Sequence, residues 1–269
     1  MTTKIITLIV FACASLFGYA QKGNVWNAKK CAVVLTYDDA LNEDIDNVAP
    51  ALDSLGLKGT FYLSNYTGTL DTRMDAWKRI GENGHELGNH TYYHPCLGNL
   101  PGRGFVKPES DLSRYAILRI DQEIHMMNTL LKAFDGKDKR SFAYPCGDVK
   151  IGDSAYLDPL RKEFTGARGT QPEMPQIQNV DLYNIGCYGI NGQSGEELIA
   201  MVKKAMDAGS LLVFLFHGVG GGHSLNVSLE AHSLLLHFLR QHESEIWIAP
   251  MTDVAAFIQQ YQTSLKSNK

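Results

Sequence analysis

The sequence has no run of lysine and arginine, and its 25 basic residues are outnumbered by 29 acidic ones. Without a basic patch, neither nucleic acid nor an anionic membrane surface is expected as a partner. The five cysteines include no CxxC pair, so the usual ligand spacing of a structural zinc site is missing. Linkers rich in proline, glycine and serine, internal repeats and low-complexity tracts are also missing. Residues 21–269 are therefore expected to form a single domain.

One long apolar run does occur, from Ile5 to Phe17, after a single charge at Lys4. It is too short to be a permanent membrane anchor, and it is followed by small residues typical of a cleavage site. We expect residues 1–20 to be a signal peptide and the remainder to be periplasmic or secreted, without a stable membrane anchor. Cys13 resembles a lipoprotein attachment cysteine, but the apolar run continues past it, which disfavours lipidation.

Export permits disulfides among the four cysteines beyond that leader, Cys31, Cys96, Cys146 and Cys187. Four cysteines allow three pairings, and their spacing does not rank them. Buried free thiols or one incidental bridge are the simplest interpretation.

Apolar strands alternate with amphipathic helices along the chain, a pattern typical of a parallel α/β protein. The expected strands follow the order 32–37, 59–63, 85–89, 140–144, 164–168, 182–187, 211–216 and 245–249. The expected helices lie within 42–56, around 77–80, and over 111–134, 194–209, 225–239 and 254–261. Seven or eight strands alternating with helices favour a barrel over an open sheet.

Two adjacent carboxylates, Asp38 and Asp39, end the first apolar strand. Such a pair alone usually marks a solvated turn or a helix cap. Here Val33 to Leu35 immediately precede it, so the pair lies at the end of a buried strand, where unpaired charge is costly. A turn of the backbone at this point would direct both carboxylates to one site.

Three histidines are placed to meet this pair. His90 and His94 lie four residues apart after the third expected strand, a spacing that suits one divalent ion when an aspartate is the third ligand. His217 follows six apolar residues; it is either a core histidine or, together with the other groups, the general acid. His223, beside three glycines, is placed at the rim of the site.

These stretches resemble the motifs of the polysaccharide deacetylases, carbohydrate esterase family four, with the NodB homology domain. Residues 36–40 (TYDDA) are similar to the family's T-F-D-D-G motif, 90–94 (HTYYH) to its H-[ST]-x-x-H motif, and 215–217 (LFH) to its late L-x-H motif. The similarity extends over about residues 31–258 in order and spacing.

The resemblance implies an irregular (β/α) barrel with about seven parallel strands and a bound divalent ion, most often zinc. It implies that Asp39, His90 and His94 hold the metal, that Asp38 is the base and that His217 is the acid. The family's R-P-P-Y-G motif aligns with residues 143–147, so the backbone N–H of Cys146 would stabilise the oxyanion, and Tyr144 and Pro145 would line the sugar site.

The chain departs from the family at two places. The motif arginine that pairs with the base carboxylate is replaced by Ala143, and we expect Arg168 or Arg140 to reach Asp38 instead. The family's fourth motif, which contains an aspartate, has no clear counterpart, and Asp181 matches it poorly.

The sequence therefore predicts an exported, metal-dependent hydrolase that removes acetyl groups from a glycan, as an N-acetyl sugar or an O-acetylated polysaccharide. The motifs do not separate amide from ester, because both pass through a tetrahedral intermediate. The alternatives are an acetylxylan-type esterase and a secreted carbohydrate-binding protein that has lost turnover.

Overall fold

The computed structural model describes residues 25–267, so the expected signal peptide lies outside the described residues. The main sheet has the strand order β7-β4-β3-β2-β1-β9-β8, and β12 pairs with β1. All of these strands are parallel. The strands are β1 (Cys31–Asp38), β2 (Thr60–Leu63), β3 (Glu86–Asn89), β4 (Arg140–Ala143), β7 (Phe164–Arg168), β8 (Tyr188–Gly189), β9 (Leu211–Phe216) and β12 (Ile246–Ile248).

The sheet is curled into a half-barrel, which confirms the expected (β/α) barrel class. Strand β1 is its centre, because β9 pairs with one edge while β12 and β2 share the other, β12 near the start of β1 and β2 near its end. The carboxyl ends of β1, β3, β4 and β9 therefore meet on one side. In α/β barrels this is the side that carries the active site.

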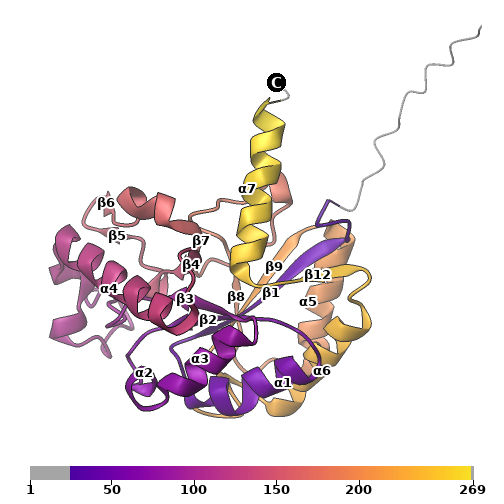
Figure 1. The fold of residues 1–269 in the computed structure, drawn as a ribbon, viewed down its shortest axis with the longest axis horizontal. Coiled ribbons are helices and arrows are strands. Elements are labelled where there is room, and N and C mark those ends of the chain that lie inside the picture. The colour runs from indigo at the N-terminus through magenta and orange to yellow at the C-terminus, as the bar shows by residue number, and fades with distance from the viewer. Residues whose placement is uncertain (1–24, 268–269) are drawn as a thin grey trace, which may run out of the picture.

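Helices connect the strands and cover both faces of the sheet (Figure 1). They are α1 (Ala49–Ser54), α2 (Thr69–Thr72), α3 (Met74–Glu82), α4 (Ile117–Asp135), α5 (Gly195–Ala208), α6 (Leu229–Gln241) and α7 (Met251–Ser267). Short helical turns are η1 (Asp44–Val48), η2 (Pro108–Ser110), η3 (Leu112–Arg114), η4 (Pro145–Gly147), η5 (Asp158–Glu163) and η6 (Ile177–Asn179). The pairs β5 (Lys150–Ile151) with β6 (Ser154–Ala155), and β10 (Gly218–Val219) with β11 (Asn226–Val227), stand apart from the main sheet.

The alternation of β1 divides the core into two layers. Val33 and Leu35 pack into the cluster that includes side chains of α1, α5 and α6. Ala32 and Val34 point the other way and pack into the cluster that contains Ile258 of α7. Both faces of β1 are thus buried, and the polar side chains at its carboxyl end lie at the edge of a closely packed core.

Most expected elements are present, with three corrections. The strand expected over 182–187 is wrong: only an isolated bridge joins Ile185 to Arg168, and the short β8 follows at 188–189. The helix expected over 111–134 starts at Ile117, because Asp111 caps the turn η3 instead. The helix expected from Leu225 starts at Leu229, where Ser228 accepts a hydrogen bond from the Ala231 N–H as N-cap.

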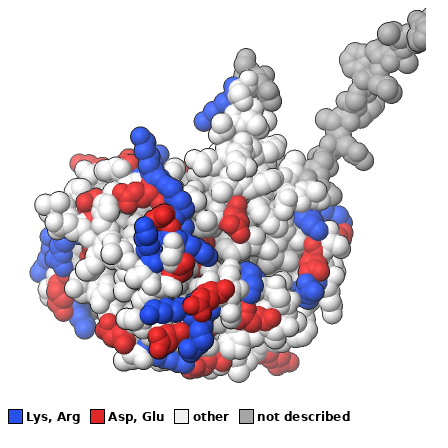
Figure 2. All heavy atoms as spheres, viewed as in Figure 1, with Lys and Arg blue, Asp and Glu red and all other residues white. Residues whose placement is uncertain are grey.

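Acidic and basic side chains are interspersed over the face shown in Figure 2. Within residues 25–267, no helix combines the length and the apolar character needed to cross a membrane. The periplasmic or secreted location expected from the sequence therefore stays a prediction.

Candidate active site

The two carboxylates at the end of β1 face one site because the backbone turns sharply there. Asp38 is the last strand residue, and Asp39 and Ala40 both have positive φ, 79° and 55°. The Asp39 N–H donates to the Tyr62 carbonyl at 3.2 Å, which ties the turn to β2. Asp38 and Asp39 are only 3% and 4% exposed, so their charges need partners within the protein.

The two histidines after β3 are brought to Asp39 by a second tight turn. Thr91 and His94 have positive φ, so the segment after β3 is a tight turn and not a helix. The Asn89 side chain accepts from the Thr91 N–H at 2.8 Å, and the Thr91 hydroxyl accepts from the His94 N–H at 3.1 Å. These bonds satisfy the backbone and place the His90 and His94 rings 4.8 Å apart.

Both imidazoles direct Nε2 at Asp39. Its Oδ1 lies 3.6 Å from His90 Nε2 and 3.3 Å from His94 Nε2. Oδ1 is also a buried atom without a hydrogen-bond partner. Two imidazole nitrogens and one unpaired carboxylate oxygen within 4.8 Å of one another are a donor set that fits a divalent ion such as zinc.

The electrostatics of this cluster favour charged Asp39 and neutral His90. Burial raises the pKa of Asp39, but His94, His90 and His217 together lower it below its ordinary value. Burial lowers the pKa of His90 to about 4, although Asp38 opposes this shift. An ionised carboxylate and a neutral imidazole are the protonation states that bind a metal.

His217, which follows β9, completes the cluster from the opposite side. Its Nε2 lies 3.9 Å from Asp39 Oδ2, and its Nδ1 is buried without a hydrogen-bond partner. Burial lowers its pKa, against the effect of Asp38 and Asp39. Its ring stacks on His223 with centroids 4.7 Å apart, which places His223 at the rim as expected.

Asp38 is paired with a buried arginine, Arg168, at the end of β7. The guanidinium Nη2 donates to Asp38 Oδ2, and the Arg168 side chain is fully buried. Ala143 and Arg168 are register partners on β4 and β7, so the arginine lies one strand away from the motif position that lacks it. Arg140, the other candidate partner, does not reach Asp38; it donates to Asp135 and to the carbonyls of Leu87 and Lys137.

The loop after β4 forms another wall. Tyr144 donates through its hydroxyl to the Tyr183 carbonyl, Pro145 is buried, and Cys146 has φ 56°. At Gly147 a Cβ would lie 2.1 Å from the Thr170 hydroxyl, so only glycine fits this turn. Cys146 forms a disulfide with Cys96, a pairing that the sequence did not rank.

These side chains line one cavity of about 670 Å³. Its walls include the sequence-predicted residues Asp38, Asp39, His90, His94, Tyr144, Cys146 and His217. The lining residues that sequence reasoning missed include Tyr66, Arg103, Phe105 and Thr170. Tyr66, Arg103 and Phe105 lie in connecting loops, where no periodicity or motif marks them.

Comparison with known proteins gives a consistent family. The sequence profile described as "Polysaccharide deacetylase" matches residues 27–157. A peptidoglycan-N-acetylglucosamine deacetylase of Bacillus cereus is 32% identical over 113 residues, which cover 39% of this chain and 38% of that protein. The matches to four curated relatives span between 10% and 38% of the relatives' own lengths.

Two solved structures share the fold. A Mycobacterium smegmatis protein, provisionally described as a polysaccharide deacetylase, superposes with TM-score 0.58 at 14% identity and covers 87% of this chain and 92% of its own. A Bacillus anthracis protein described as a CE4 family pseudoenzyme superposes with TM-score 0.51 at 17% identity and covers 84% and 66%. The profile match over residues 27–157 and the curated relative confirm the resemblance to the polysaccharide deacetylase family, and the two solved structures share the fold.

Proposed function

We propose that this protein is a metal-dependent hydrolase that removes acetyl groups from a glycan. The observation that carries the proposal is the convergence of Asp39, His90 and His94 around the unpartnered Oδ1 of Asp39, beside Asp38 and His217. Three ligands leave room for water and substrate, which distinguishes a catalytic from a closed structural site. When bound there, a divalent ion, most often zinc in this family, would polarise the acetyl carbonyl and make water more acidic.

Asp38 and His217 have complementary roles in this proposal. Asp38 accepts a proton from the water that attacks the acetyl carbon, and Arg168 holds its carboxylate in place. His217 donates a proton to the leaving nitrogen or oxygen as the acyl bond breaks, and acetate and the deacetylated sugar are the products. The backbone N–H of Cys146 is proposed to stabilise the oxyanion.

The surroundings of the cavity support a glycan as the substrate. Of the aromatic side chains in residues 25–267, three are exposed: Tyr66 at 60%, Tyr93 at 54% and Phe105 at 58%. All three line a second hollow of about 420 Å³, which shares Tyr66, His94 and Phe105 with the first cavity. Exposed rings beside a polar site suit the apolar faces of neighbouring sugar units.

Acetate release from acetylated glycans tests the proposal. Purified protein should release acetate from acetylated chitooligosaccharide or from acetylxylan, and a chelator should abolish the release. The preferred substrate would decide between N-deacetylation and an acetylxylan-type esterase. Glycan binding without acetate release in the presence of metal would instead support the non-catalytic alternative.

A further inference from the structure

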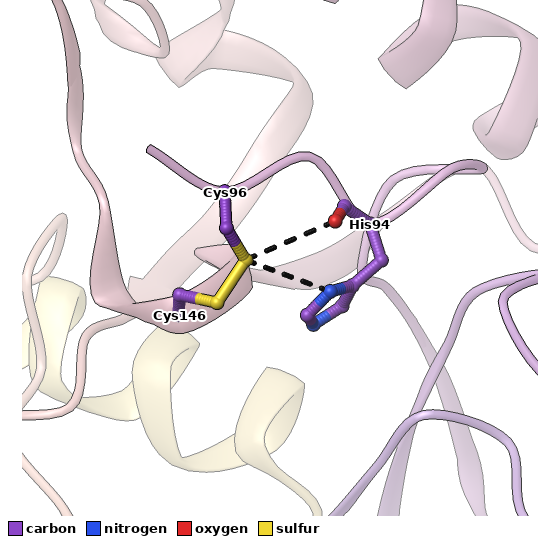
Figure 3. A group of neighbouring side chains, drawn as sticks. All are labelled: His94, Cys96 and Cys146. Atoms are coloured by element: carbon purple, nitrogen blue, oxygen red, sulfur yellow. Dashed lines mark hydrogen bonds between the residues drawn. A yellow bond between two sulfur atoms is a disulfide. The ribbon is translucent and has the colours of Figure 1, made fainter. Parts of the chain in front are cut away.

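The His94 ring has a different partner on each side. Its Nε2 faces Asp39, whereas its Nδ1 lies 3.7 Å from the Sγ of Cys96 (Figure 3). That sulfur belongs to the disulfide with Cys146, 50 residues further along the chain. The disulfide thus joins the segment that carries His94 to the loop after β4.

A disulfide sulfur carries no hydrogen, so in a hydrogen bond with Nδ1 it can only be the acceptor. When the proton of a neutral His94 ring lies on Nδ1 and is donated to this sulfur, the lone pair of Nε2 is free on the side that faces Asp39. The 3.8 Å contact from the same sulfur to the His94 carbonyl is not a hydrogen bond, because neither atom carries hydrogen.

The Nδ1 of His90 also faces a group that can only accept a hydrogen bond, here a backbone carbonyl. Its Nδ1 lies 2.8 Å from the carbonyl oxygen of Ala143, which also can only accept. His90 therefore presents Nε2 to Asp39 with a free lone pair, and the disulfide sulfur favours the same tautomer for His94. A metal-binding histidine is usually held in this way by a group that accepts from its other nitrogen.

We propose that the Cys96–Cys146 disulfide is a positioning element that fixes the tautomer and orientation of His94. The inference rests on the proposed function in one respect: it takes a divalent ion as the group that His94 Nε2 binds. Reduction would place a thiol hydrogen beside Nδ1. The thiol can donate to Nδ1, which favours the tautomer whose Nε2 carries the proton and cannot bind a cation.

The two loops are also joined by hydrogen bonds that do not involve the disulfide. The Leu97 N–H donates to Asp148 Oδ2 at 2.8 Å. Arg103 donates to Asp148 at 3.2 Å and to the Cys146 carbonyl at 3.2 Å. A variant without the disulfide is thus expected to keep the loops together and to lose mainly the sulfur beside His94.

The first test measures zinc affinity by competition with a chromophoric chelator. The Cys96→Ala/Cys146→Ala double variant has no thiols at this place to act as rival ligands, and it should bind zinc about 10- to 100-fold more weakly than wild type. Cys31→Ala removes a buried free cysteine at the start of β1 and should bind zinc like wild type. Asp148→Ala removes hydrogen bonds between the same loops but leaves the disulfide beside His94 intact. Its loss of zinc affinity should be clearly smaller than that of the double variant.

The second test needs no metal. In ¹⁵N NMR spectra of the metal-free wild type at pH 8, the share of the His94 tautomer that is protonated at Nδ1 should be larger in the oxidised protein than after reduction, while the Asp39 carboxylate beside Nε2 is the same in both states. Unchanged zinc affinity in the double variant, or the same His94 tautomer ratio before and after reduction, would overturn the proposal. If wild type binds no zinc, the proposed function fails, and the NMR tautomer alone decides the role of the disulfide.

Discussion

The guanidinium of Arg168 donates a hydrogen bond to the carboxylate of Asp38, and both groups are buried. The two residues lie 130 positions apart, at the ends of β7 and β1. Burial lowers the pKa of Arg168, but Asp38 and its other neighbours raise it above its ordinary value, so the arginine stays charged. Arg168 supplies the positive charge that the methyl side chain of Ala143, at the aligned motif position, cannot supply.

Replacing this arginine should reduce both stability and turnover. Arg168→Met leaves the Asp38 carboxylate buried and unpaired, which should cost about 3–5 kcal/mol in the free energy of unfolding. The rate of acetate release should fall, because Asp38 loses the partner that orients it. Urea unfolding and kcat on the same preparation measure the two effects.

Arg140→Met is the matched control for this variant. Arg140 is also a buried arginine paired with a buried aspartate, Asp135, but it lies at the start of β4, away from the cavity. The Arg140→Met variant should lower the free energy of unfolding about as much as Arg168→Met does, while its kcat per folded molecule stays near wild type. If both variants lost turnover equally, Arg168 would have no specific role at the site.

His217 should matter for turnover and not for metal binding. His217→Asn should lower kcat on an acetylated glycan by about 10²- to 10⁴-fold. The loss should be much smaller on 4-nitrophenyl acetate, because nitrophenolate leaves without a proton. Zinc affinity should stay within a few-fold of wild type; a large loss would make His217 a ligand instead of the acid.

Phe105 should affect long substrates more than short ones. Phe105→Ala removes an exposed ring from the wall shared by the two hollows, which is worth roughly 0.5–1.5 kcal/mol, or about 2- to 12-fold in KM for an oligosaccharide. KM for 4-nitrophenyl acetate should not change. Leu118→Ala, an equally exposed apolar side chain on α4 outside both hollows, is the control. Equal effects on both substrates would contradict a glycan groove at this place.

Two buried histidines outside the site should make the fold sensitive to acid. Burial lowers the pKa of His85 and of His232 to about 4. Between about pH 6.5 and 4 the unfolded chain therefore binds more protons than the folded one, so stability falls as the pH falls. Each histidine contributes up to about 1.4 kcal/mol per pH unit in this window.

Urea unfolding at several pH values, with chelator present, measures this slope. His232→Gln can still accept from the Tyr37 hydroxyl but does not titrate. The fall of its unfolding free energy with falling pH should therefore be shallower, by up to about 1.4 kcal/mol per pH unit. His125 is exposed and its pKa is raised, chiefly by a hydrogen bond to the Asp121 carbonyl. His125→Gln should therefore change the slope little, and in the opposite direction. An unchanged slope in His232→Gln would show that this histidine is not the source.

The sequence was sufficient for features set by local patterns. The apolar run of β1 ending in two aspartates is visible because a buried parallel strand is a continuous apolar segment. The helix expected within 42–56 contains α1, which starts just before Pro50 and ends before Gly56, as the backbone preferences of these two residues favour. The helix expected over 194–209 agrees with α5, whose N-cap Ser194 forms a capping box with Glu197.

Features that depend on register and loop packing were not visible. Nothing local shows that Arg168 is the strand neighbour of Ala143, because that pairing is set by the order of β4 and β7 in the sheet. The Cys96–Cys146 pair depends on two loops meeting above β3 and β4. The short β8 contains only two residues, too few for a periodic signal, so the strand was expected several residues early.

The central claim is that Asp39, His90 and His94 hold one divalent ion that is required for deacetylation. The most direct measurement is acetate release from acetylated chitooligosaccharide and acetylxylan by wild type and Asp39→Asn, after metal removal and during stepwise addition of zinc. We expect the metal-free wild type to be inactive and to recover fully at one zinc per chain, while Asp39→Asn recovers little. Full activity without metal, or equal recovery in both proteins, would contradict the claim.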